Sequence, residues 1–217
     1  GEILWTKGVV KDVHKILFTE DGKLVSLTTE TFCYSCLVAK EKYIKYFNIA
    51  DGKLVLRVER EKHVEDIFST GNARELGVIF TEKIVKYKVD FTEHKLKRIK
   101  EVSTTELGVF RGFSPNGEHL YYEKKGEARS VIKVLNRDLK VIYSKRIKIY
   151  KNGQYRIFPA NNFTIIVRYQ KNEESLARIM VYKQGGLSYQ ILVKNSYKKI
   201  AYSGDADKIV AYSRTSV

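Results

Sequence analysis

Two cysteines are the first residues whose type and spacing could do chemistry. Cys33 and Cys36 form a single C-x-x-C motif, and thiolates at this spacing bind zinc or exchange a disulfide. A zinc site needs further ligands, but the four histidines show no H-x₃₋₅-H spacing. Redox cysteines usually lie at the start of a helix, and no helical pattern surrounds this motif. We therefore expect structural thiols, with a metal site or a local disulfide at Cys33 and Cys36 as the alternative.

Patterns of catalytic residues are missing elsewhere in the sequence. It contains no Gly-x-Ser-x-Gly nucleophile elbow and no glycine-rich phosphate loop. Its carboxylates form no evident pair for acid–base work, because Glu59 and Glu61 alternate with Arg60 and Lys62. The sequence predicts no catalytic residue and no cofactor.

Positive charge gathers in two stretches of a chain whose net charge is +15. Between Arg137 and Arg156 seven basic residues face one acidic residue, and between Lys83 and Lys100 seven face two. Positive charge with exposed tyrosines can follow a phosphate backbone and stack on bases. The candidate nucleic-acid-binding residues are Lys97, Arg98, Lys140, Lys145, Arg146, Lys148, Tyr150 and Lys151. Alternatively, this charge protects solvent-exposed outer strands from edge-to-edge aggregation.

An aromatic residue followed by a turn recurs along the chain and indicates the elements that carry these clusters. The five copies begin at Phe18, Phe68, Phe113, Phe158 and Tyr202, at intervals of 50, 45, 45 and 44 residues. In the third copy, Phe-Ser-Pro-Asn-Gly, proline presets φ and Asn-Gly accepts a positive φ. A period near 45 built from short strands is typical of a β-propeller with one four-stranded blade per repeat.

Alternating apolar runs separate these turns, and no segment has a helical period. Clear examples are Val13–Phe18, Lys83–Asp90, Lys199–Tyr202 and Ile209–Tyr212. We expect an all-β chain, a propeller of about five four-stranded blades in a single domain over residues 1–217. The expected blades are 12–60, 63–103, 106–148, 153–195, and 197–217 together with 1–8. The last blade is either incomplete or closed by the N-terminal strand, or the chain is part of a larger propeller.

The first interval is longer than the others, which indicates an added segment from Thr31 to Lys42. We expect it to be a loop that joins the second and third strands of the first blade. Loops on a rigid scaffold often carry function. The favoured partner-contact residues are Phe32, Tyr34, Lys40 and Lys42.

Composition limits the class of protein further. With 43% hydrophobic and 12% aromatic residues and only two prolines, the chain is not of the disordered class. No apolar run reaches about 18 residues, so no membrane span is expected, and the first ten residues do not resemble a signal peptide. Two cysteines fit a reducing compartment, which predicts an intracellular, cytoplasmic protein. The net positive charge favours acidic partners, namely nucleic acid, an anionic membrane or an acidic protein surface. Alternatively, it is a general property of a lysine-rich or thermophilic organism's charged surfaces.

The repeats resemble the WD-repeat family. Residues 113–117 are close to the family's phrase at the first turn of each repeat, and His14 and His63 lie near the place of its Gly-His pair. The family's Trp-Asp pair at the end of the third strand is replaced here, by Phe47-Asn48, Val89-Asp90, Leu135-Asn136 and Tyr182-Lys183. The resemblance implies a non-catalytic scaffold that presents loops to its partners.

The sequence thus predicts a scaffold that mediates protein–protein interaction in an intracellular complex. The first alternative is direct binding of RNA or DNA through a basic face. The second is a propeller hydrolase or lyase whose residues gather at the central channel from several blades.

Overall fold

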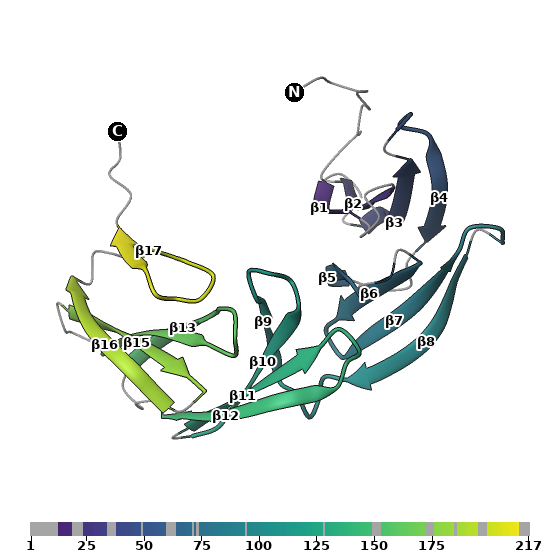
Figure 1. The fold of residues 1–217 in the computed structure, drawn as a ribbon. Coiled ribbons are helices and arrows are strands. Elements are labelled where there is room, and N and C mark those ends of the chain that lie inside the picture. The colour runs from purple at the N-terminus through teal and green to yellow at the C-terminus, as the bar shows by residue number, and fades with distance from the viewer. Residues whose placement is uncertain are drawn as a thin grey trace. The chain divides into compact units, whose positions relative to one another are not determined.

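The structure is a computed structural model, and all regular secondary structure in the part it describes is β-strand (Figure 1). The described residues are 13–18, 24–33, 38–48, 50–59, 64–70, 72, 74–93, 95–127, 129–148, 153–171, 176–184, 186–194 and 199–212. This confirms the expectation of an all-β chain. Within these ranges there is no helix long and apolar enough to cross a membrane.

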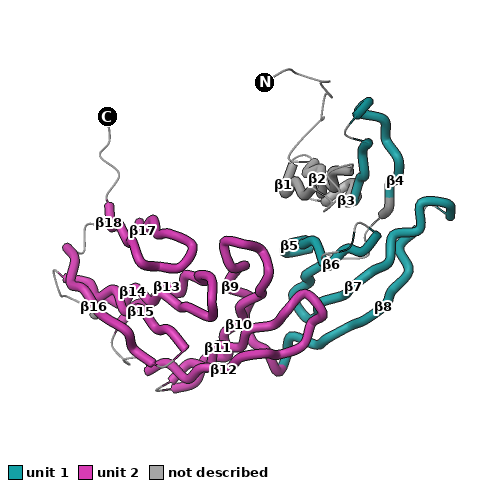
Figure 2. Tube along the Cα trace, in the orientation of Figure 1, with its two compact units in different colours: residues 1–105 teal, residues 106–217 magenta. Residues whose placement is uncertain are grey.

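The chain forms two compact units, residues 1–105 and 106–217, which Figure 2 shows in different colours. Each unit consists of antiparallel sheets in which the strands follow one another in chain order. The single domain expected over residues 1–217 remains a prediction.

The first unit contains two four-stranded sheets. Their strands are β1 (Val13–Phe18), β2 (Leu24–Cys33), β3 (Val38–Asn48) and β4 (Leu54–Glu59), then β5 (Val64–Ser69), β6 (Glu75–Phe80), β7 (Lys83–Asp90) and β8 (Lys95–Ser103). Ile44 and Leu56 of the first sheet share a core with Val64, Ile67 and Val85 of the second. The apolar faces of neighbouring sheets therefore bury each other, as the repeat pattern requires.

The segment from Thr31 to Lys42 differs from the expected loop. β2 and β3 run into it from both sides, and Thr31 pairs with Glu41 while Cys33 pairs with Val38. Residues 34–37 lie outside the described residues. The β-branched and aromatic residues of Thr28–Cys33 suit an extended backbone, so the hairpin is prolonged at this point.

The second unit contains two four-stranded sheets and one two-stranded sheet. Their strands are β9 (Val109–Phe113), β10 (His119–Lys125), β11 (Arg129–Asn136) and β12 (Val141–Lys148), then β13 (Gly153–Pro159), β14 (Ile165–Lys171), β15 (Leu176–Lys183) and β16 (Gly186–Lys194), and finally β17 (Lys199–Tyr202) and β18 (Ile209–Tyr212). The four four-stranded sheets of the two units are consistent with about four blades of the predicted propeller. The N-terminal strand expected to complete the fifth blade, residues 1–8, lies outside the described residues.

β14 shows how these sheets pack on both faces. Ile165 and Val167 join a core with Tyr121 and Ile132 of the preceding sheet. Ile166, between them, points the other way and packs with Ala206 and its neighbours in the last sheet. Successive strand residues face opposite sides, so a continuous apolar run such as Ile-Ile-Val is typical of a sheet buried on both faces.

The repeated turns of the second unit touch one another. The backbone amide of Asn116 donates to Oδ1 of Asn161 at 3.1 Å, and the amide of Asn161 donates to the carbonyl of Gly204 at 2.6 Å. The hydroxyl of Tyr121 donates to the carbonyl of Ala160 at 2.7 Å. The turns after Phe113, Phe158 and Tyr202 therefore form a row, which we call the turn row.

Two glycines next to these elements have positive φ angles. Gly117 has φ 70°, as its Asn-Gly turn predicts, and a Cβ there would meet nothing within 4 Å. Gly108 has φ 94°, and a Cβ there would lie 2.1 Å from the carbonyl oxygen of Glu123. Glycine at 108 therefore allows the chain before β9 to approach the backbone of β10 closely.

Candidate functional site

In the basic cluster on β8, Lys97 and Arg98 are paired with acids of their own sheet. Lys97 Nζ lies 2.8 Å from Oδ2 of Asp90 and 3.3 Å from Oε2 of Glu93, and Arg98 Nη1 lies 2.9 Å from Oε2 of Glu101. The hydrogen bond from Lys97, followed by that from the amide of Glu93, lowers the pKa of Asp90 to about 2. Charges arranged in this way fit a protected outer strand better than a free phosphate-binding surface.

Lys97→Met is expected to raise the pKa of Asp90 toward its ordinary value. The folded-state pKa lies below the unfolded value, so this group stabilises the fold above pH about 4 and loses that effect as the pH falls toward 2. NMR titration of the Asp90 carboxyl carbon measures this pKa in the wild-type protein and in the variant. An unchanged pKa in the variant would show that Lys97 is not the cause of the shift.

The basic cluster on β12 has a different character. The side chains of Lys140, Lys145 and Arg146 form no ion pair or hydrogen bond with the described residues. Tyr143 on the same strand stacks on Phe163, with ring centroids 5.3 Å apart and an interplanar angle of 21°. Its ring therefore belongs to the core and is not free to stack on a base.

The remaining sequence-predicted residues divide between strand positions and undescribed ones. Phe32 and Cys33 end β2, Lys40 and Lys42 belong to β3, and Lys148 is the exposed last residue of β12. Tyr34, Cys36, Tyr150 and Lys151 lie outside the described residues. The partner-contact role of the Thr31–Lys42 segment remains a prediction. The described residues contain no group of three or more His, Cys, Asp or Glu side chains that could hold a metal ion.

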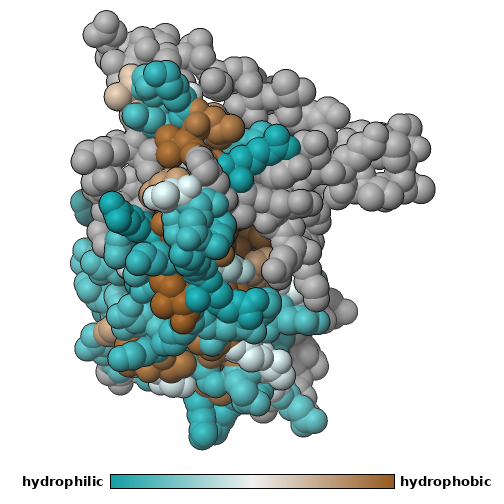
Figure 3. All heavy atoms as spheres, turned by 90° about the vertical axis from the view of Figure 1, so that its right-hand side faces the viewer, coloured by the Kyte–Doolittle hydropathy of each residue, from teal (hydrophilic) through white to brown (hydrophobic). Residues whose placement is uncertain are grey.

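The outer strand β16 carries an exposed apolar patch that sequence reasoning did not single out. Leu192 is 62% exposed, Leu187 51% and Leu176, on β15, 42%. The pairings Leu176–Lys194, Arg178–Leu192 and Tyr182–Leu187 place the three leucines on one face of the sheet. We call Leu176, Leu187 and Leu192 the β16 patch. Exposed apolar side chains also occur on the outer strands β8 (Ile99, 50%) and β12 (Val141, 50%), so the β16 patch is distinguished by its three leucines on one face and not by exposure alone. Figure 3 shows a face of the molecule on which the described residues are mostly hydrophilic.

The sheet that carries this patch has an unbalanced charge. Residues 153–171, 176–184 and 186–194 include no Asp or Glu and six basic residues. These are Arg156, Arg168, Lys171, Arg178, Lys183 and Lys194. Glu173 and Glu174, in the connection between β14 and β15, lie outside the described residues, and Lys183 is already paired with Asp207 at 2.7 Å. The surplus of basic residues over the sheet would attract an acidic partner.

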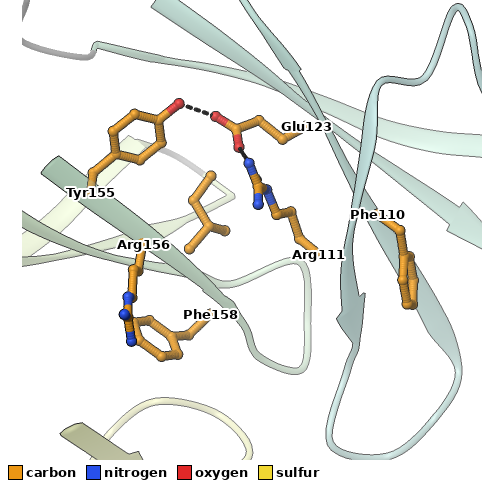
Figure 4. Close-up of a pocket in the computed structure, with 7 residues that line it drawn as sticks. Phe110, Arg111, Glu123, Tyr155, Arg156 and Phe158 are labelled. Atoms are coloured by element: carbon orange, nitrogen blue, oxygen red, sulfur yellow. Dashed lines mark hydrogen bonds and ion pairs between the residues drawn. The ribbon is translucent and has the colours of Figure 1, made fainter. Parts of the chain in front are cut away.

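A cavity of about 300 Å³ lies in the second unit, where β9 and β10 meet β13. Figure 4 shows its lining, in which Glu123 lies close to Tyr155 and Arg111, while Arg156 and Phe158 extend from β13. The lining residues are Phe110, Arg111, Glu123, Tyr155, Arg156, Ile157 and Phe158. Charged, aromatic and aliphatic groups together are typical of a site that binds an amphipathic ligand.

Glu123 is fully buried, and both of its oxygens are engaged. Arg111 donates to Oε2 from Nε at 2.7 Å and approaches the same oxygen with Nη2 at 2.5 Å. Ser130 donates to Oε1 at 2.5 Å, and Tyr155 also donates to this atom. Burial, and then the hydrogen bond to Glu123, raise the pKa of Tyr155. A buried carboxylate paired in this way is a stable part of the cavity wall.

Arg156 differs from Arg111, because its side chain forms no ion pair or hydrogen bond with the described residues. It is exposed and pairs across the strands with Arg168, which is only 7% exposed. Burial, and then the charge of Arg156, lower the pKa of Arg168. Two like charges directly opposite each other on a sheet are destabilising. The lining of the cavity has a surplus of positive charge, because it contains Arg111 and Arg156 and one carboxylate, Glu123.

No family model matches the sequence, and no curated protein matches it either. Solved structures do match. Hydrazine synthase of Kuenenia stuttgartiensis is 15% identical with a TM-score of 0.53, over 96% of this chain and 58% of that one. Dipeptidyl peptidase 4 of Porphyromonas gingivalis is 13% identical with a TM-score of 0.53, over 90% and 33%. Acylaminoacyl peptidase of Pyrococcus horikoshii is 12% identical with a TM-score of 0.54, over 92% and 38%.

These likenesses concern the fold. The chain spans between about a third and three fifths of the lengths of these solved proteins, whose matching parts are propellers. At identities of 15% and below, shared architecture gives no activity. The four antiparallel four-stranded sheets and these structural neighbours together identify the fold of this chain as a β-propeller.

Proposed function

We propose that this chain is a non-catalytic binding module that docks an acidic protein partner on the outer strand β16, within an intracellular complex. The observation that carries the proposal is the β16 patch of exposed leucines on a sheet with six basic residues among those described. The resemblance of residues 113–117 to the WD-repeat turn supports a scaffold as well.

The partner contributes an extended strand. β16 is the last strand in its sheet and, among the described strands, pairs only with β15. Its outer edge can accept a further strand through main-chain hydrogen bonds, while side chains determine specificity. Apolar side chains of the partner would cover Leu187 and Leu192, and its carboxylates would lie near Arg178 and Lys194.

A second candidate function is binding of RNA or DNA along β12. The side chains of Lys140 and Arg146, which pair with none of the described residues, favour it, because such cations can release the counterions of a phosphate backbone. The stacking of Tyr143 on Phe163 argues against it, since single-stranded nucleic acid usually requires free aromatic rings.

Catalysis has less support from the cavity. A general base needs a free lone pair directed at the substrate. The oxygens of Glu123 already accept from Arg111, Ser130 and Tyr155. This arrangement supports a role in binding.

The experiment uses a short peptide that alternates leucine with glutamate, fluorescently labelled, and measures its binding at several salt concentrations. We expect binding that weakens with salt and is reduced at least about tenfold by Leu192→Asp, which places a charge where an apolar side chain should pack. Equal binding by the variant would contradict the proposal.

Three controls separate this proposal from its alternatives. A peptide that alternates leucine with lysine should not bind. Val210→Asp introduces the same charge at another exposed apolar position, since Val210 is 61% exposed on β18, and should leave binding unchanged. If single-stranded RNA binds instead, with affinity lost in Lys140→Glu and Arg146→Glu, the nucleic-acid function replaces the proposed one.

A further inference from the structure

The cavity between β9, β10 and β13 contains one positive charge that nothing in its described surroundings offsets. Its lining includes two guanidinium groups, of Arg111 and Arg156, and one carboxylate, of Glu123. Arg111 and Glu123 compensate each other through their short contacts. Arg156 is the surplus charge.

The position of Arg156 is unfavourable without a ligand. It lies directly opposite Arg168, whose side chain is almost fully buried. Cross-strand like charges repel each other, and because Arg156 is exposed, water screens part of this repulsion. A bound anion would reduce the repulsion between Arg156 and Arg168, and this reduction would increase the affinity of the cavity for the anion.

A cationic ligand is excluded by the same contacts. An ammonium group would need an acceptor, but Glu123 already receives hydrogen bonds on both oxygens. It would also meet the charge of Arg156. The cavity therefore selects an anion.

The rest of the lining is apolar. Phe110, Ile157 and Phe158 are half-buried and supply rings and a branched aliphatic chain. Phe158 leaves β13 on the same side as Arg156, two residues away, and Figure 4 shows the two side chains next to each other. At about 300 Å³ the cavity is at the small end of ligand pockets, so its ligand has the size of one or two amino-acid residues.

We propose that this cavity binds a small carboxylate with an apolar or aromatic body, and that Arg156 is its anion-binding residue. The planar fork of a guanidinium matches a carboxylate in a bidentate pair. The body of the ligand would cover Phe158, which lies on the same face of β13 as Arg156. Such a group occurs in free N-acylated amino acids and aryl acids, and also at the C-terminus of a peptide. The site is separate from the β16 patch and does not depend on its function.

The test measures binding of N-acetyl-L-phenylalanine and of the corresponding amide by calorimetry. We expect the acid to bind and the amide to bind at least about tenfold more weakly, because only the acid forms a charge-assisted pair. Arg156→Gln should weaken binding of the acid by a similar factor. The Nε–H NMR signal of Arg156 should move on addition of the acid.

The melting temperature of Arg156→Gln distinguishes a binding role of Arg156 from a structural one. Since Arg156→Gln removes a like charge opposite Arg168, we expect the melting temperature to stay unchanged or rise; a marked fall would overturn the proposal. Equal binding of acid and amide, or no binding at millimolar concentration, would also overturn it.

Matched variants distinguish this site from the β16 patch. Arg178→Gln removes an exposed arginine of the same sheet outside the cavity and should leave binding of N-acetyl-L-phenylalanine unchanged. Leu192→Asp should do the same, while Arg156→Gln should not affect the leucine–glutamate peptide. An alanine peptide that ends in phenylalanine separates the two sources of ligand: tighter binding than the free acid indicates a peptide C-terminus, and weaker binding indicates a free small acid.

Discussion

Glu123→Leu is expected to lower the free energy of unfolding by about 3 kcal/mol or more, because removing one member of a buried, hydrogen-bonded ion pair leaves its partners uncompensated. Arg111 would lose its counter-charge, and the hydroxyls of Ser130 and Tyr155 would lose their acceptor. Ser130 is fully buried, so the loss of its acceptor costs free energy. Equilibrium unfolding in urea measures the change.

Two comparisons make this result specific. Glu106 also pairs with a lysine, Lys124, at 3.2 Å, but its side chain is 79% exposed. Glu106→Leu should therefore change the stability by less than about 1 kcal/mol. In the double variant Glu123→Leu/Arg111→Met the loss should be smaller than the sum of the single losses, because neither charge is left unpaired. Strict additivity would contradict a coupled pair.

Gly108→Ala is expected to destabilise the second unit by about 2–5 kcal/mol, since the strain of a positive φ adds to a steric clash. The new Cβ would lie 2.1 Å from the carbonyl oxygen of Glu123, which belongs to the backbone of β10 and has no flexible end to move aside. Because β10 carries Glu123, the variant should also disturb the cavity. Urea unfolding and binding of N-acetyl-L-phenylalanine measure the two effects.

Gly117→Ala is the matched control for this prediction. Gly117 also has a positive φ, 70°, but a Cβ there has free space around it. It should cost only about 1–2 kcal/mol, the usual penalty for a left-handed non-glycine residue. If both alanine variants lose the same stability, the close approach to β10 contributes nothing.

Local patterns predict much of this fold. The alternating runs predict Val13–Phe18 and Lys83–Asp90 to the residue, and both strands are confirmed. Asn-Gly predicts the positive φ at Gly117. These features depend on neighbouring residues alone, which is why period and turn chemistry are sufficient.

The candidate sites depend on residues far apart in the sequence. Glu123 contacts Tyr155, 32 positions away in the sequence, and no local sequence pattern predicts a contact at this distance along the chain. One signal was present, since Glu123 continues the run Leu120–Tyr122 that the core buries. The two basic clusters look alike in sequence, but Lys97 pairs with Asp90 of the neighbouring strand, whereas Lys140 forms no ion pair with the described residues. The sequence gives the number of charged residues in each cluster, but it does not show which of them form ion pairs in the fold.

The turn row has a consequence for how such a chain can grow. Asn116 and Asn161 are 45 residues apart, the same interval that separates the repeats, and Asn161 both accepts a hydrogen bond from one neighbour and donates one to the next. Each of these turns donates a backbone amide to the following turn, although the acceptor is the Asn161 side chain in one contact and the Gly204 carbonyl in the other. Duplication of one whole repeat in a gene would therefore add a blade whose turn can form hydrogen bonds with the turns before and after it. Insertion of half a repeat would leave the neighbouring turns without these hydrogen-bond partners.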